Sequence, residues 1–229
     1  MTAASGQHRH ILALDTAGGR IAACIISDGE CYFHQSGGES AGATRSTTII
    51  PALQGLLEQA CLSWRQLDVL ALGAGPGSFT GLRVAAATLA GVNAALQLPL
   101  IQLSSLAITA RQADSSEQIR VLEDARAGEL FYGCYRQGEA VQADCCMRWS
   151  QVEKYRSESD HPGLFCALNE PPIALEGWRR VALSMPRSQA LAIAALAACG
   201  KVKAWGRLPH YPSPNYLQPS QAERGAHHG

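Results

Sequence analysis

The chain has 229 residues, enough for one large domain or two modest domains with hydrophobic cores. Hydrophobic residues make up 47% of it and charged residues 17%, a composition that excludes an intrinsically disordered protein. Its 19 basic and 19 acidic residues give no formal net charge, so we do not expect this chain alone to bind nucleic acid strongly, because that affinity comes mainly from Lys and Arg neutralising phosphates.

The eight cysteines form no CxxC pair, and most lie in apolar runs, as expected of buried free thiols in a reducing cytosol. Residues 1–10 hold no apolar core of signal-peptide length. The longest apolar stretch near the end, residues 190–199, is about half of what a membrane-spanning helix needs. These features predict a soluble cytoplasmic protein without membrane contact.

A three-stranded antiparallel meander is expected at the start of the chain. Residues 11–16 form a short apolar strand that ends in Asp15 and Thr16, and residues 21–27 and 30–35 form two further strands joined by an Asp28-Gly29 hairpin turn. A helix then begins among residues 46–48, with Pro51 in its first turn. It carries apolar residues at helical spacing, namely Ile49, Ile50, Leu53, Leu56, Leu57 and Ala60.

The next stretch predicts a strand, a glycine turn and a helix. Residues 67–72 are apolar, residues 73–83 read GAGPGSFTGLR, and an Ala-rich segment runs to residue 98. Gly75 and Gly77 permit a positive φ or a close approach of another backbone, and Ser78 or Thr80 can cap the helix. Such a turn can hold an anion at the helix N-terminus, or it can simply set the start and angle of the helix. With no adenosine pocket, metal pair or base recognised around it, the architectural interpretation is favoured.

The helix after the turn carries unusually small side chains. Gly91 costs a helix roughly 1 kcal/mol relative to Ala, so close packing should offset it, either on the chain's own sheet or against another protein. With the preceding helix it would form half of a four-helix interface. The predicted partner interface comprises Ile50, Leu53, Leu57, Arg83, Ala87, Ala90, Gly91 and Ala94.

Two further expectations concern this helix. Arg83 stands in its first turn, which is unfavourable to the helix dipole, so Arg83 should have an acidic or carbonyl partner in this chain or across the interface. Because small apolar faces rarely stay wet, we expect a homodimer when the partner is absent.

The element order through residue 112 predicts an α/β fold. A strand over residues 98–103 and a helix capped by Ser104 or Ser105 complete a ribonuclease-H-like layer, the half-unit of actin-like and sugar-kinase-like ATPases. We expect an N-terminal subdomain over residues 1–112, on which residues 204–219 pack back, a smaller subdomain over residues 113–203, and a disordered tail over residues 220–229.

The smaller subdomain is predicted in less detail. Residues 119–124 and 129–136 form a hairpin, and residues 163–168 and 179–183 are short strands within the poorly defined region 140–185. A helix over residues 188–199 is closed by Gly200.

Asp15 is the strongest candidate for chemistry, because actin-like ATPases hold Mg²⁺ and phosphate where an acid at the tip of a central strand is followed by a hydroxyl and glycines. Asp15, Thr16, Gly75 and Gly77 are therefore predicted to form a vestigial site for ATP or ADP; the alternative is an ordinary polar strand end. Asp124-Ala125-Arg126 is either a similar strand end or part of a hairpin. No HExxH pair or GxSxG elbow occurs, so we expect no metal site and no catalytic residue.

The runs at residues 11–16, 75–83 and 103–106 resemble the TsaB (YeaZ) family, and residues 124–132 and 214–217 resemble its second-domain hairpin and closing segment. Arg45 stands where many members carry a His. The resemblance implies two related actin-like (ASKHA ATPase) subdomains, the second reduced. It also implies a non-catalytic subunit in the synthesis of threonylcarbamoyladenosine beside the tRNA anticodon.

In that system the first two helices pair with the catalytic paralogue TsaD, the ATPase TsaE joins them, TsaC supplies the activated intermediate, and tRNA is met only through the complex. No cofactor is required, although ATP or ADP could bind at the subunit junction. Two alternatives remain open: an autonomous ATP-hydrolysing enzyme that uses Asp15 and the glycine turns, and a peptidase that depends on Ser78 or a metal.

Overall fold

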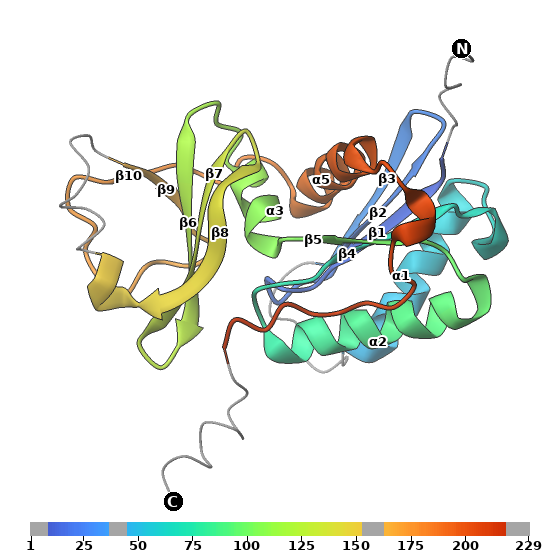
Figure 1. Cartoon of the computed structure of the whole chain (residues 1–229), viewed down its shortest axis with the longest axis horizontal. Coiled ribbons are helices and arrows are strands. Elements are labelled where there is room, and N and C mark those ends of the chain that lie inside the picture. Colours follow the sequence, from blue (N-terminus) through green and yellow to red (C-terminus); the bar gives the residue numbers. More distant parts are fainter. Residues whose placement is uncertain (1–8, 37–44, 153–162, 219–229) are drawn as a thin grey trace, which may run out of the picture.

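The computed structural model describes residues 9–36, 45–152 and 163–218 of the chain. Two five-stranded mixed sheets lie side by side along the long axis of the molecule (Figure 1), with strand orders β3-β2-β1-β4-β5 and β10-β9-β6-β7-β8. The predicted disordered tail over residues 220–229 lies outside the described residues.

The first sheet follows the predicted meander. Strands β1 (Ile11–Asp15), β2 (Ala22–Ser27) and β3 (Glu30–Gln35) are antiparallel, and β4 (Val69–Gly73) and β5 (Leu100–Leu103) run parallel to β1. Asp28 and Gly29 have φ values of 50° and 85°, the left-handed conformation of a tight hairpin turn, which confirms the predicted Asp-Gly turn. The order 3-2-1-4-5 is that of the predicted ribonuclease-H-like layer.

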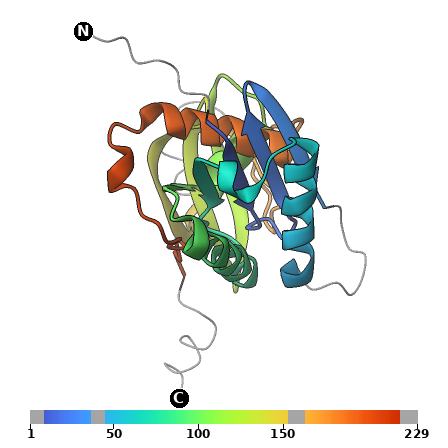
Figure 2. The ribbon, with the colours of Figure 1, turned by 90° about the vertical axis from the view of Figure 1, so that its right-hand side faces the viewer.

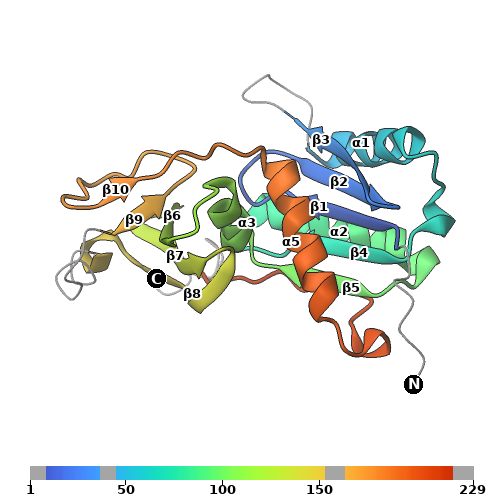
Figure 3. The ribbon, with the colours of Figure 1, turned by 90° about the horizontal axis from the view of Figure 1, so that it is seen from above.

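Helices cover both faces of the first sheet (Figures 2 and 3). Helices α1 (Arg45–Gln59) and α2 (Phe79–Leu96) pack on one face, where Leu12, Leu14 and Leu70 meet Leu53 and Leu89 in one buried core. Helix α5 (Arg187–Lys201) packs on the other face, over a second core. Short 3₁₀ turns, η1 (Trp64–Gln66) and η2 (Trp205–Arg207), flank this half.

The second sheet repeats the topology of the first. Its central strand β6 (Gln118–Arg126) is followed by antiparallel β7 (Glu129–Arg136) and β8 (Glu139–Arg148), and then by β9 (Leu164–Cys166) and β10 (Arg179–Arg180), which run parallel to β6. The strand order is again 3-2-1-4-5 when counted from β6. The predicted α/β fold class, with two mixed sheets flanked by helices, is confirmed.

The two halves exchange their last helices. Helix α3 (Ser105–Gln112) follows β5 of the first sheet but packs on β6, β7 and β8 of the second. Helix α5 follows β10 but packs on β1, β2, β3 and β5 and touches α3. By its contacts α5 therefore belongs to the first half, which corrects its placement in a subdomain over residues 113–203.

The segment after α5 returns along the first half. The amide of Leu100 donates to the Pro209 carbonyl at 2.9 Å, and the amide of Asn215 donates to the Ala74 carbonyl at 2.7 Å. Residues 204–217 thus lie against the N-terminal half, next to the glycine turn.

The observed helix ends can be compared with the predicted caps and boundaries. Ser78 is the N-cap of α2, with its hydroxyl accepting from the Gly81 amide at 3.3 Å, and Ser104 caps α3. Helix α1 already runs at Arg45, so Pro51 lies inside it rather than in a first turn. Helix α5 continues to Lys201 and ends at extended Val202, so the prediction that Gly200 closes it is wrong.

Candidate functional site

The glycine turn between β4 and α2 is packed against other parts of the backbone. A Cβ added at Gly77 would lie 2.6 Å from the Cβ of Ala17, and one at Gly81 would lie 2.6 Å from the Thr16 carbonyl oxygen. Gly75 has a φ of +107°, and its added Cβ would lie 2.9 Å from the Asn215 carbonyl oxygen. The glycines thus permit close approach by the chain's own β1–β2 turn and closing segment.

Asp15 lies at the centre of a buried polar cluster between the two halves. It is 0% exposed, and its Oδ1 accepts from the Ser105 hydroxyl at 2.8 Å. Its Oδ2 accepts from Nε of Arg187, the first residue of α5, at 2.6 Å. The Arg187 guanidinium also donates to the Thr109 hydroxyl at 2.8 Å, to Gln112 Oε1 at 3.2 Å and to the Ser105 carbonyl at 3.2 Å.

Glu123 on β6 brings a second acid to the cluster. Its Oε1 accepts from the Thr109 hydroxyl at 2.6 Å, and the residue is 6% exposed. Burial raises the pKa of Glu123, while the charge of Arg187 and the Thr109 hydrogen bond oppose that rise. Burial would lower the pKa of Arg187, but the charges of Asp15 and Glu123 raise it overall. The charge of one guanidinium therefore stabilises a carboxylate from each sheet.

This arrangement shows what the residues of the predicted nucleotide site contact within the chain. Both carboxylate oxygens of Asp15 are bonded within the chain, and Thr16, also 0% exposed, donates its hydroxyl to the Gly81 carbonyl at 2.7 Å. Gly75 lies in the same region, and its amide donates to the Ser105 hydroxyl at 3.1 Å. The predicted residues are thus brought together, and the side chains of Asp15 and Thr16 are buried and hydrogen-bonded within the chain.

Arg187 was not singled out in the sequence, although one signal was available. A cation at the first position of a helix is unfavourable to the helix dipole and needs an acidic partner, the same reasoning that was applied to Arg83. The partner, Asp15, lies 172 residues away in the chain, so no local pattern pairs them.

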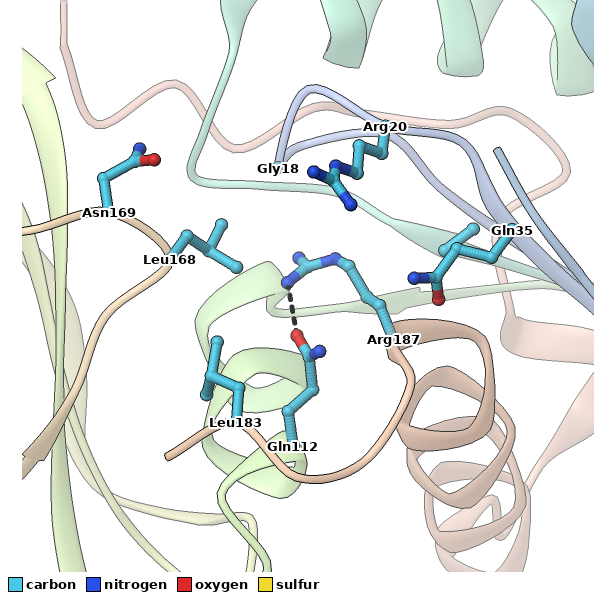
Figure 4. A pocket seen from close by; sticks show the side chains of 9 residues that line it. Gly18, Arg20, Gln35, Gln112, Leu168, Asn169, Leu183 and Arg187 are labelled. Carbon is cyan, nitrogen blue, oxygen red and sulfur yellow. Dashed lines mark hydrogen bonds between the residues drawn. The ribbon is translucent and has the colours of Figure 1, made fainter. Parts of the chain in front are cut away.

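A pocket of about 260 Å³ opens beside this cluster, in the cleft between the halves (Figure 4). Residues of the first half form one wall and residues of the second half the other, with Gln112 and Arg187 on the floor between them. The lining residues are Gly18, Arg20, Ala22, Gln35, Gln112, Leu168, Asn169, Leu183 and Arg187.

The predicted partner interface is accessible in part. Ala87, Gly91 and Ala94 are exposed along α2, Ala90 is half-buried, and Ile50 is 44% exposed on α1. Leu53 and Leu57 are both 0% exposed in the core under α1, so the structure removes these two from the predicted surface.

Arg83 has an aromatic neighbour instead of an acidic one. Its guanidinium lies 3.8 Å from the ring centre of Phe79 and 6.0 Å from that of Tyr216, and the two rings lie 5.0 Å apart. This cation–π arrangement, rather than an ion pair, is what the structure records for Arg83 within the described residues.

Other predicted features give no further site. Asp124 is exposed, and its Oδ1 accepts from the Arg126 amide at 3.1 Å in a hairpin turn. All eight cysteines are free thiols. Within residues 9–36, 45–152 and 163–218, no group of three His, Cys, Asp or Glu could hold a metal ion. Helix α2 is long and apolar enough by composition to cross a membrane, a property that core helices share, and 33% of it is buried.

The family described as TsaD: tRNA N6-adenosine threonylcarbamoyltransferase matches residues 21–169. The chain belongs to this TsaD-like family. Two relatives are named tRNA threonylcarbamoyladenosine biosynthesis protein TsaB. The one from Haemophilus influenzae is 34% identical over 129 residues, 55% of this chain and 53% of the relative. The one from Escherichia coli is 31% identical over 132 residues, 56% of each chain. The chain thus spans about half the length of the curated relatives it matches.

Solved structures agree over a greater length. YeaZ from Pseudomonas aeruginosa aligns with a TM-score of 0.69 at 24% identity, covering 91% of this chain and all of that one. A second structure from the same organism, described as similar to peptidase YeaZ, gives 0.71 at 23% identity over 92% of this chain. The fold of this member of the TsaD-like family is therefore that of YeaZ, and the predicted resemblance to the TsaB (YeaZ) family is confirmed.

Proposed function

We propose that the chain is a non-catalytic subunit of the complex that adds the threonylcarbamoyl group to adenosine next to the tRNA anticodon. In this proposal it binds the catalytic TsaD subunit, stabilises it and activates it. The family match and the names of the two relatives support this pathway. The surface formed by α1 and α2, hereafter the α1–α2 surface, supports the docking role.

The observation that carries the proposal is the pair of helix-interior glycines on the α1–α2 surface. A Cβ added at Gly55 or Gly91 would meet no atom within 4 Å. Each glycine weakens its helix by roughly 1 kcal/mol relative to Ala, and the chain's own packing gains nothing from the missing methyl group. A second helix that packs closely on this face would use the missing methyl groups, because small residues let helix backbones approach inside the usual 8–10 Å.

The buried cluster supports the non-catalytic part. An actin-like enzyme needs a carboxylate that can reach a metal-bound water, whereas Asp15 is engaged by Ser105 and Arg187. In the proposed assembly the reaction is carried out by TsaD, TsaE joins the pair as the ATPase, TsaC acts in the same pathway, and tRNA is bound through the complex. We further propose that the isolated chain forms a homodimer through the α1–α2 surface, since exposed apolar faces tend to be covered.

The proposal is tested by co-purification with the TsaD protein encoded in the same genome. Gly91→Trp and Gly55→Trp place a bulky ring on the α1–α2 surface from positions where an added Cβ meets nothing within 4 Å, so both variants should fold and lose the partner. Gly200→Trp is the matched control, because Gly200 is also a helical glycine with open space around it, on the opposite face of the sheet. Retention of TsaD by a folded Gly91→Trp variant would refute the docking surface.

A further inference from the structure

The pocket between the halves has donors on its walls and no acid. Its nine lining residues include two arginines, two glutamines and one asparagine, and neither Asp nor Glu. Figure 4 shows that Arg20, from the turn between β1 and β2, extends toward Arg187 across the pocket. Of the two lining arginines, Arg187 is ion-paired with Asp15, and Glu170, the residue after Asn169, is ion-paired with Arg180.

Several donors of this pocket remain available. Among the described residues, Arg20 has neither a hydrogen-bond partner nor an ion-pair partner. The amide group of Gln35 accepts from the Ser188 backbone at 3.2 Å through its oxygen, which leaves its NH₂ group unused by the described residues. Arg187 makes four hydrogen bonds with its five N–H groups, which leaves one Nη2–H unused by the described residues.

We propose that this pocket binds a small oxyanion, the phosphate or carboxylate group of a small molecule. The fork of a guanidinium matches both groups, and a charge-assisted hydrogen bond is roughly twice as strong as a neutral one. Leu168 and Leu183 offer an apolar side to whatever short chain bears the anion. The volume of about 260 Å³ lies below the roughly 300–1,000 Å³ of pockets that hold drug-sized ligands, so the ligand is smaller than a nucleotide.

A ligand at this place touches both halves of the molecule. Arg20 and Gln35 come from the first sheet, whereas Leu168 and Asn169 follow β9 of the second. Binding therefore adds contacts to both halves and raises the thermal midpoint, because the unfolded chain has no such pocket. The inference concerns a different surface from the α1–α2 surface and does not depend on the proposed function.

The test titrates the full chain with potassium phosphate and, separately, with sodium succinate, and compares both with sodium chloride at equal ionic strength. Thermal unfolding gives affinity, and backbone amide NMR shifts of Gly18 and Asn169 report the location. We expect one of the two anions to give a saturable rise in midpoint together with shifts at both amides, and the anion that binds identifies the phosphate or the carboxylate source. No saturable effect beyond sodium chloride, or shifts confined to other residues, would overturn the proposal.

Variants make the test specific to Arg20. Arg20→Gln removes an exposed charge and should weaken binding at least about tenfold, which corresponds to about 1.4 kcal/mol. Arg65→Gln removes an equally exposed charge on η1, outside the pocket, and should bind within twofold of the parent chain. Equal binding by Arg20→Gln, or an equal loss in both variants, contradicts the assignment. Tighter binding of ATP than of phosphate, with the same amide shifts, also contradicts the assignment, because a nucleotide exceeds the proposed ligand size.

Discussion

The two halves share one strand order but differ in what covers their strands. In the first half the connection from β3 to β4 contains α1, and that from β4 to β5 contains α2. In the second half the connection from β9 to β10, residues 167–178, contains no helix, and these two strands have only three and two residues. The counterpart of α2 is therefore missing, and the small-residue helix proposed to meet a partner exists in the first half alone.

The halves also share the position of an acid. Asp15 lies on β1 and Glu123 on β6, the central strand of each sheet, and both belong to the cluster held by Arg187. Arg187 arrives on α5, which crosses from the second half to the first. The two halves repeat the topology and the buried acid, but not the cation. Both carboxyl groups depend on the single guanidinium of Arg187.

The largest effect should follow from removal of that cation. Arg187→Met keeps most of the side-chain length but leaves two buried carboxyl groups without their positive partner. We expect a loss of about 3–5 kcal/mol in the free energy of unfolding, the cost typical of breaking a buried ion pair on one side. Urea denaturation monitored by circular dichroism measures it.

A second variant separates the charge from simple packing. Arg187→Met combined with Asp15→Asn removes the uncompensated charge of the first half, so it should regain a large part of the loss. If the double variant is as unstable as the sum of the two single variants, the carboxyl–guanidinium pair is not what joins the halves.

The variant Gly73→Ala tests how tightly the Asp15 carboxylate is packed in the first half. A Cβ at Gly73 would lie 1.9 Å from Asp15 Oδ1, so Gly73→Ala must displace the carboxylate from Ser105 and Arg187. We expect a loss of about 2–3 kcal/mol, in the range of overpacking in a rigid core. The matched control is Gly55→Ala on α1, where an added methyl group meets nothing within 4 Å and should stabilise the isolated chain slightly. Equal unfolding midpoints for the two variants would contradict the packing around Asp15.

Glu123, the buried acid of the second half, should affect how the free energy of unfolding depends on pH. Burial raises the pKa of Glu123 above its ordinary value of 4.5. A carboxyl group with a higher pKa in the folded state binds protons more tightly there. Its contribution to stability is therefore full below pH 4.5 and is lost as pH rises through the folded-state pKa.

Glu123→Gln keeps an oxygen to accept from Thr109 but cannot ionise. The variant should therefore gain stability relative to the parent chain as pH rises above about 4.5, because only the parent must ionise a buried carboxyl group or keep it protonated. Urea midpoints at pH 5 and pH 7.5 measure the difference between the two chains. A difference that stays constant, or that favours the parent at the higher pH, would contradict the raised pKa of Glu123.

More of the first half than of the second could be predicted from the sequence, for a physical reason. The apolar runs of β1, β4 and β5, the Asp28-Gly29 turn and the Ser78 and Ser104 caps are local signals that need no knowledge of the fold. Strands β9 and β10 have so few residues that tertiary pairing selects them, β9 with β6 and β10 with β9, and no local pattern marks their ends.

The site was predictable only in outline. The sequence marked Asp15 as unusual because an acid ends an apolar strand, but Ser105 and Arg187 reach it from 90 and 172 residues away and change its role. The helical spacing of Leu53 and Leu57 likewise revealed an apolar stripe without showing that the stripe faces the sheet. Periodicity identifies a buried face, and only the tertiary fold decides what covers it.

The smallest effect is expected from the contact that joins the halves at the surface. Glu139, in the second half, accepts from Lys201 of α5 and lies 3.5 Å from Nη2 of Arg111 of α3. The side chains of Lys201 and Glu139 are 62% and 54% exposed, so water screens the pair. Lys201→Ala should cost less than about 0.5 kcal/mol in the free energy of unfolding, in contrast to Arg187→Met, although both remove a cation that α5 offers to an acid. Unfolding in 0.5 M sodium chloride provides the control, since salt should remove the difference between Lys201→Ala and the parent chain while leaving the Arg187→Met difference nearly unchanged. A surface effect as large as the buried one would mean that α5 is held by its outer contacts, and that burial of the Asp15–Arg187 pair is not what holds this helix in place.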